Sequence, residues 1–203
     1  MFADMSTLIE GIATHPGESF REILPYALVG AMVLVAMHLI LALCTRREVV
    51  RKSRWNLWEK LVYLASIGSV AMLGATAFFG LLRHGILEGW LLFAHMFGAG
   101  AFVVVLPVLA ITWCEASRFG GRRGGEEDED AAPRFSWIPK VMFWIILVSG
   151  LTVTLTMLLS MLPLYGTDCL HDLLDVHRYA GLVAVVATVF HFYTVVLQRF
   201  GLR

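Results

Sequence analysis

Five long apolar segments constrain this chain more than any other feature of its sequence. A helix needs about 20 predominantly apolar residues to cross the hydrocarbon core of a bilayer. Hydrophobic residues make up 58% of the 203 residues and the mean hydropathy is +0.73, which is well above the balance of a soluble domain. We therefore predict an all-α integral membrane protein, a bundle of five transmembrane helices, with spans at about residues 25–44, 59–82, 89–113, 138–162 and 176–198.

The distribution of basic residues predicts the direction in which these spans run. Thirteen of the 16 Lys and Arg residues lie in the connector 45–60, in the connector 114–140 or in the C-terminal tail. Only Arg21, Arg83 and Arg178 lie at the opposite ends of the spans. Because basic residues are enriched in cytoplasmic connectors, we expect the N-terminus outside the cell and the C-terminus in the cytoplasm.

The chain is predicted to form one transmembrane domain, residues 25–203, preceded by an N-terminal segment, residues 1–24, on the outer side. That segment carries four acidic residues and no basic leader, so we expect the first span to be retained rather than removed as a signal peptide. Residues 115–137 are rich in glycine and acidic residues, which predicts a mobile cytoplasmic loop. The three cysteines fit no metal-binding spacing and are predicted to be plain thiols.

Four histidines fall within the predicted spans, where an unpartnered imidazole is costly, so each is a functional candidate. His95 and His177 lie near the outer ends of their spans, and His38 and His191 lie near the inner ends. In "HRYAGLVAVVATVFH" the two histidines are separated by fourteen helical steps, which place them about 21 Å apart along one helix face. The four histidines therefore form two pairs at two depths. The alternative for each is a hydrogen bond to a hydroxyl or carbonyl group of a neighbouring helix.

One histidine from each of two helices at the same depth is the arrangement that holds a haem iron from both faces. A zinc or di-iron site needs three or four ligands at one depth, usually including carboxylates, and no Asp or Glu lies in the interior of a predicted span. The sequence also lacks the CxxCH motif of covalently attached haem. We therefore predict two haem b groups, an outer haem between His95 and His177 and an inner haem between His38 and His191.

Several other residues are candidates for supporting roles. Arg178 is placed to neutralise a haem propionate through paired hydrogen bonds, with snorkelling to the lipid headgroups as its alternative. Gly98 and Gly181 follow the predicted outer ligands closely and leave room for a flat ring. His84, just past the second span, is the chief alternative to His95 as a ligand.

Two motifs carry a resemblance to a known family. "HRYAGLVAVVATVFHFY" resembles the last helix of the di-haem cytochrome b subunits of formate dehydrogenase, nickel-iron hydrogenase and thiosulfate reductase, in which two histidines at this spacing bind haem. "GWLLFAHMFGAGAF" resembles the second helix of that family, which carries one ligand. The resemblance covers residues 55–200 and implies a four-helix di-haem core with an extra N-terminal helix. It places Tyr63 where the family has its fourth ligand. We expect His38 to replace that ligand, with Tyr63 or an unligated position as the alternatives.

The resemblance implies an electron-transfer subunit of a larger oxidoreductase complex in the inner membrane of a bacterium, with residues 1–24 in the periplasm. Such subunits move electrons across the lipid bilayer between a periplasmic redox partner and the quinone pool, and the quinone binds near the inner haem. Candidate quinone contacts are Trp55, Trp58, Lys60 and Tyr63, for which an ordinary interfacial belt is the alternative. The alternative functions are a stand-alone membrane cytochrome b acting on a small oxidant or reductant, and a haem-free membrane anchor. The chain has no flavin or nicotinamide fingerprint, and we expect no nucleic-acid partner.

Overall fold

The computed structural model is all-α throughout the ranges that it describes, which are residues 10–12, 14–44, 55–119 and 137–199. Five of its helices are long and apolar enough to cross a membrane. They are α2 (Pro16–Cys44), α3 (Leu57–His84), α4 (Gly89–Trp113), α5 (Trp137–Ser160) and α6 (Thr167–Arg199). The predicted fold class is therefore confirmed, and the chain is a multi-pass membrane protein. Most of the loop predicted to be mobile lies outside the described residues.

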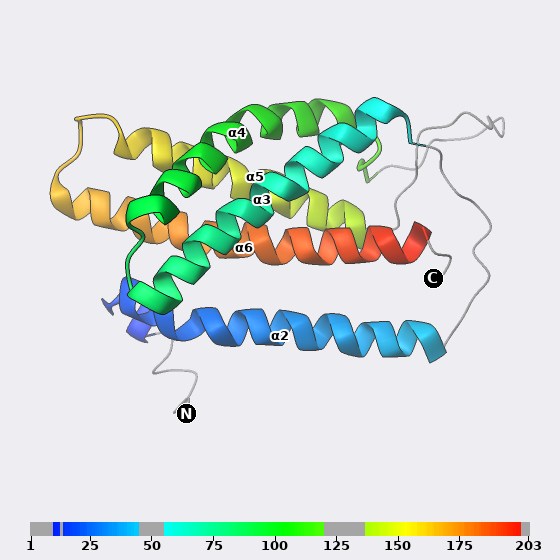
Figure 1. The fold of residues 1–203 in the computed structure, drawn as a ribbon, viewed down its shortest axis with the longest axis horizontal. Coiled ribbons are helices and arrows are strands. Elements are labelled where there is room, and N and C mark those ends of the chain that lie inside the picture. Colours follow the sequence, from blue (N-terminus) through cyan, green and yellow to red (C-terminus); the bar gives the residue numbers. More distant parts are fainter. Residues whose placement is uncertain (1–9, 13, 45–54, 120–136, 200–203) are drawn as a thin grey trace.

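Successive helices run in opposite directions, so their connectors gather at two ends of the bundle (Figure 1). One end, which we name the Gly85 end, holds the start of α2 and the connectors 85–88 and 161–166. The other end, which we name the Trp113 end, holds the last residues of α2, α4 and α6. Helices α3 and α4 form one antiparallel hairpin, and α5 and α6 form a second one. These two hairpins make up the core of the bundle.

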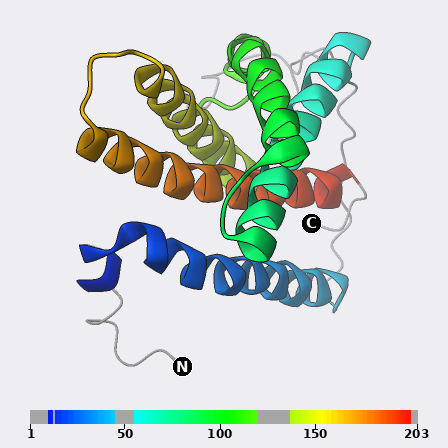
Figure 2. The same ribbon diagram turned by 60° about the vertical axis from the view of Figure 1, so that its left-hand side comes forward.

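Helix α2 lies along α6, on the side of α6 that faces away from α4 and α5 (Figure 2). At the Gly85 end the Tyr179 hydroxyl donates a hydrogen bond to the Pro16 carbonyl oxygen at 3.1 Å. The Phe20 ring meets the Tyr179 ring edge to face, with 5.1 Å between centroids. Leu24 is completely buried next to Leu182 of α6. The first turns of α2 are therefore fixed to the core by α6.

The helices extend further at the Gly85 end than the apolar segments predict. Helix α2 begins at Pro16 instead of residue 25, and α6 begins at Thr167 instead of residue 176. The prediction of spans counts only residues apolar enough for the hydrocarbon core, whereas a helix continues for as long as its backbone hydrogen bonds are made. The two extensions carry the polar residues that precede each span.

Local interactions explain why helix α3 begins and ends where it does. At its start the Asn56 side chain accepts a hydrogen bond from the Glu59 amide, and the Glu59 carboxylate accepts one from the Asn56 amide, both at 2.7 Å. This reciprocal capping box provides acceptors for two backbone N–H groups that have no partner within the first turn of the helix. The helix ends at Gly85, whose φ of +77° is a left-handed conformation that glycine adopts without a Cβ clash. The next span therefore starts only a few residues later.

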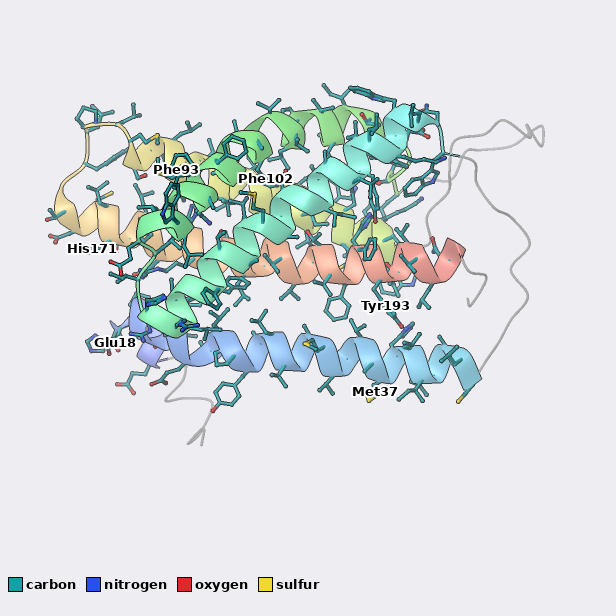
Figure 3. The ribbon with its side chains drawn as sticks, in the orientation of Figure 1. Glu18, Met37, Phe93, Phe102, His171 and Tyr193 are labelled. Atoms are coloured by element: carbon teal, nitrogen blue, oxygen red, sulfur yellow. The ribbon has the colours of Figure 1, made fainter. Side chains whose placement is uncertain are left out.

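The outer surface of the bundle is apolar, as a lipid-facing surface must be. Trp90 is 85% exposed, Ile111 84% and Met32 70%. Figure 3 shows Met37 of α2 pointing away from the other helices, whereas Tyr193 of α6 points toward α2. In the interior, hydroxyl groups such as those of Ser66 and Thr188 donate to the carbonyl oxygen four residues earlier. The chain thus satisfies its buried hydroxyl groups largely within its own helices.

Candidate functional site

A cavity of about 470 Å³ lies among α3, α4, α5 and α6, toward the Gly85 end. His95 of α4 and His177 of α6 both line it, and Phe20 of α2 contributes part of one wall. Its volume is in the range of pockets that hold drug-sized ligands or cofactors. The structure therefore brings together the two histidines that the sequence analysis paired at the outer end.

His177 is held from α5 by a hydroxyl and a carbonyl group. Its Nδ1 lies 3.1 Å from Thr156 Oγ1 and 3.2 Å from the Val153 carbonyl oxygen. The same Thr156 hydroxyl lies 2.9 Å from the carbonyl oxygens of both Thr152 and Val153. Because the hydroxyl hydrogen is directed to these carbonyl groups, its oxygen is left to accept the hydrogen on Nδ1.

His95 is held from α3 in the same way. Its Nδ1 lies 3.1 Å from Thr76 Oγ1. The Thr76 hydroxyl lies 2.8 Å from the Met72 carbonyl oxygen and 3.1 Å from that of Leu73. If Nδ1 donates in these contacts, Nε2 of each ring carries the lone pair. A metal-binding histidine uses this arrangement, with one nitrogen on the metal and the other donating to an oxygen atom.

The walls of the cavity are shaped by small residues. Five of them line it: Gly74, Ala77, Ala99, Gly181 and Ala184. A Cβ atom added at Gly181 would meet no heavy atom within 4 Å, so the space beside this residue is open. A Cβ atom at Gly74 would lie only 2.9 Å from Val185 Cγ2, so α3 and α6 approach closely there. Gly98, in contrast, packs against Leu73 and Met72 of α3.

Two polar groups in this lining complete the site. Thr154 Oγ1 is buried and has no hydrogen-bond partner among the described residues. Arg178 also lines the cavity, and its Nη1 lies 2.9 Å from Asp175 Oδ1 in an ion pair of adjacent helix turns. Apart from His95 and His177, the largely apolar lining thus contains a hydroxyl group without a described partner and one guanidinium group. A flat apolar cofactor with an anionic edge fits this set of groups.

His191 lies in different surroundings, near the Trp113 end. Its Nδ1 lies 2.9 Å from the Pro139 carbonyl oxygen of α5. Its ring centroid is 5.8 Å from that of Tyr63 and 6.3 Å from that of Phe143. The cavity beside these side chains measures about 20 Å³, which is enough for about one water molecule. The Tyr63 hydroxyl is buried there without a partner among the described residues.

His38 does not face His191 in the structure. His38 Nδ1 lies 2.9 Å from the Tyr193 hydroxyl, and the two rings meet edge to face at 5.7 Å. Tyr193 is two residues after His191, a step of about 200° around a helix, so these two side chains leave α6 on opposite sides. The described contacts therefore assemble the outer pair of histidines and not the pair predicted for the inner haem. Tyr63, the alternative to His38, is the residue found next to His191.

The remaining candidates fall into two groups. His84 is exposed at the end of α3, and the described lining of the large cavity includes His95 instead. Trp58 and Lys60 are also exposed, near the start of α3. Trp55 instead packs against Tyr63 and Trp113, with ring centroids 5.0 and 4.6 Å away. All three cysteines are free thiols.

Thr76 and Thr156 were not predicted from the sequence. Threonine is common in apolar helices, and which hydroxyl meets a histidine depends on how two helices are rotated against each other. No spacing within one span carries that information.

Comparison with known proteins adds no family to this description. No family model, curated protein or solved structure matches the chain. What is shown is a five-helix membrane protein with a large cavity among its described residues. Any more specific function is a proposal from the geometry and from the resemblance of the two motifs.

Proposed function

We propose that the chain binds haem b in the large cavity, where His95 and His177 would hold the iron, and that it carries electrons as a subunit of a membrane oxidoreductase. One observation supports this above all others. Two histidines from different hairpins line one cavity of about 470 Å³. The hydrogen bond of each Nδ1 to a threonine hydroxyl, which is the predicted alternative to a ligand role, is also compatible with a ligand role because it leaves Nε2 available. A haem held in this way supplies one-electron transfer with no open coordination position.

The residues of the chain have separate tasks in this proposal. His95 and His177 present Nε2, because Nδ1 is already committed to Thr76 and Thr156. The apolar lining keeps water away from the ring, and the small residues leave space for it. Arg178 would bind a propionate at the Gly85 end, where Asp175 holds its guanidinium group in position.

The role in electron transfer rests on the resemblance and on the distribution of basic residues. With the N-terminus outside, the Gly85 end faces the periplasm of a bacterial inner membrane. A haem near that end is close to periplasmic redox subunits, and the quinone pool in the bilayer is its second partner.

An inner haem at His191 is a prediction of the sequence analysis that this arrangement does not favour. A haem there would need Tyr63 and Phe143 to move, because the cavity next to them measures about 20 Å³. Its second ligand would be His38 or Tyr63, and either would have to leave its present contacts. We therefore base the proposed function on the outer site alone.

The test is a redox-difference spectrum of the purified full chain together with its His95→Ala and His177→Ala variants. We expect a low-spin b-type spectrum that each substitution abolishes or converts to high spin. His84→Ala is the matched control, because His84 is exposed nearby in α3, and it is expected to keep the wild-type spectrum. A wild-type chain without a Soret band would overturn the proposal and favour a haem-free anchor.

A further inference from the structure

The two threonines that hold the histidines occupy equivalent places in the two hairpins. Thr76 of α3 meets His95 of α4, and Thr156 of α5 meets His177 of α6, both at 3.1 Å. Each threonine lies on the helix that precedes its histidine, and each hydroxyl is also close to the carbonyl oxygen four residues earlier. The same threonine–histidine contact therefore occurs twice, once in each hairpin.

We propose that Thr76 and Thr156 are positioning residues that fix both histidines in the tautomer with a hydrogen on Nδ1 and thereby set the reduction potential of the bound iron. This inference rests on the proposed haem site. When the carbonyl group of the residue four positions earlier accepts the hydroxyl hydrogen, the threonine oxygen is left to accept the hydrogen on Nδ1 of the ring. The Nδ1 hydrogen, the threonine hydroxyl and the helix carbonyl form a chain in which each hydrogen bond strengthens the next.

A helix carbonyl group stands beside each threonine as a second acceptor. Val153 O lies 3.2 Å from His177 Nδ1, and the Leu73 carbonyl group interacts with His95. Both carbonyl groups belong to the residue three positions before the threonine. Removing the hydroxyl therefore leaves each histidine partly held, and we expect a change in the properties of the haem rather than its loss.

The direction of the change follows from ligand basicity. An acceptor on Nδ1 makes the imidazole a stronger electron donor through Nε2. A stronger donor stabilises ferric iron relative to ferrous iron. Losing the threonine oxygen should therefore shift the midpoint potential to a more positive value.

The experiment compares Thr76→Val and Thr156→Val, which keep the side-chain shape, with Thr76→Ser and Thr156→Ser, which keep the hydroxyl group. In redox titrations of the full chain with haem, we expect both Val variants to keep their haem and titrate at a more positive potential. The Ser variants should titrate like the wild type. Thr152→Val is the matched control, because the Thr152 hydroxyl bonds the Val148 carbonyl oxygen on α5 at 2.9 Å and contacts neither histidine.

A second measurement does not require haem. In ¹⁵N NMR of the histidine-labelled full chain produced under haem limitation, the His95 and His177 signals are assigned with the His95→Gln and His177→Gln variants. We expect the Nδ1–H tautomer for both in the wild type and an increased share of the Nε2–H tautomer in the Val variants. Wild-type rings protonated on Nε2, or Val variants with wild-type potential and tautomer, would overturn the inference. A haem-free wild type with the expected tautomers would overturn the proposed function and the effect on the reduction potential, and would leave only the fixing of the tautomer.

Discussion

The Tyr193 hydroxyl lies 2.9 Å from Nδ1 of His38, and this contact ties the peripheral helix α2 to α6. It is the counterpart, near the Trp113 end, of the bond from Tyr179 to the Pro16 carbonyl oxygen at the Gly85 end. Helix α2 is otherwise largely exposed to lipid, with Val29, Met32 and Ile40 all more than half exposed. The two tyrosines of α6 thus hold both ends of one helix.

We predict that Tyr193→Phe loosens α2 without affecting the haem spectrum. Hydrogen bonds between transmembrane helices contribute about 0.6 kcal/mol on average, so a loss of that order is expected in the unfolding free energy. Unfolding in detergent with denaturant measures it, and Tyr165→Phe in the connector between α5 and α6 is the control. His38→Ala should behave like Tyr193→Phe. A b-type band lost in His38→Ala would instead support the inner-haem prediction.

The two cavities predict the haem content of the purified chain. The cavity at His95 and His177 measures about 470 Å³, whereas the one at His191 measures about 20 Å³. A pyridine-haemochrome assay should therefore give about one haem per chain, because the described residues bring together one pair of histidines, His95 and His177. His191→Ala should leave that value unchanged. Two haems per chain, reduced to one by His191→Ala, would show that the aromatic side chains around His191 move aside for a second haem.

A substitution at Gly181 should fill the cavity without changing either proposed ligand. A side chain at this position enters open space next to the cavity, since nothing lies within 4 Å of its Cβ position. We predict that Gly181→Leu folds but loses most of its haem, measured as the Soret absorbance per chain. Gly30→Leu on the exposed face of α2 also places its Cβ in open space and should keep wild-type haem content. Equal haem in both variants would contradict the placement of the cofactor.

Two glycines of α3 should respond oppositely to the same substitution. Gly→Ala in a helix normally stabilises by about 0.5–1 kcal/mol, which is the expectation for the exposed Gly68. At Gly74 the new methyl group would lie 2.9 Å from Val185 Cγ2, a stiff β-branched side chain, so Gly74→Ala should destabilise by roughly 1–3 kcal/mol. Thermal unfolding of both variants measures the difference. A stabilised Gly74→Ala would mean that α3 and α6 do not pack as closely as described.

The depth of the candidate residues along the bundle could be predicted from the sequence. The rotation of each helix about its own axis, which decides the neighbours that a side chain meets, could not. Counting residues from the ends of apolar segments placed His95 and His177 at one level, and the structure has them lining one cavity. The same count put His38 level with His191. Which side of α6 receives α2 is decided by packing between helices, and α2 lies on the Tyr193 side. The spans themselves were predictable because the hydrocarbon core fixes the length of an apolar helix.

The division of the site between two hairpins has a consequence for how the protein is made. Helices α3 and α4 carry Thr76 and His95, and helices α5 and α6 carry Thr156 and His177, so each half brings one ligand together with its own orienting hydroxyl group. A first half inserted during synthesis would carry only one of the two proposed ligands. A haem that needs both histidines, as proposed, would be captured only after the last helix has been inserted, and it would then link two halves that the polypeptide joins through the segment after Trp113. In the proposed haem site, cofactor loading would therefore occur only in a completely inserted chain.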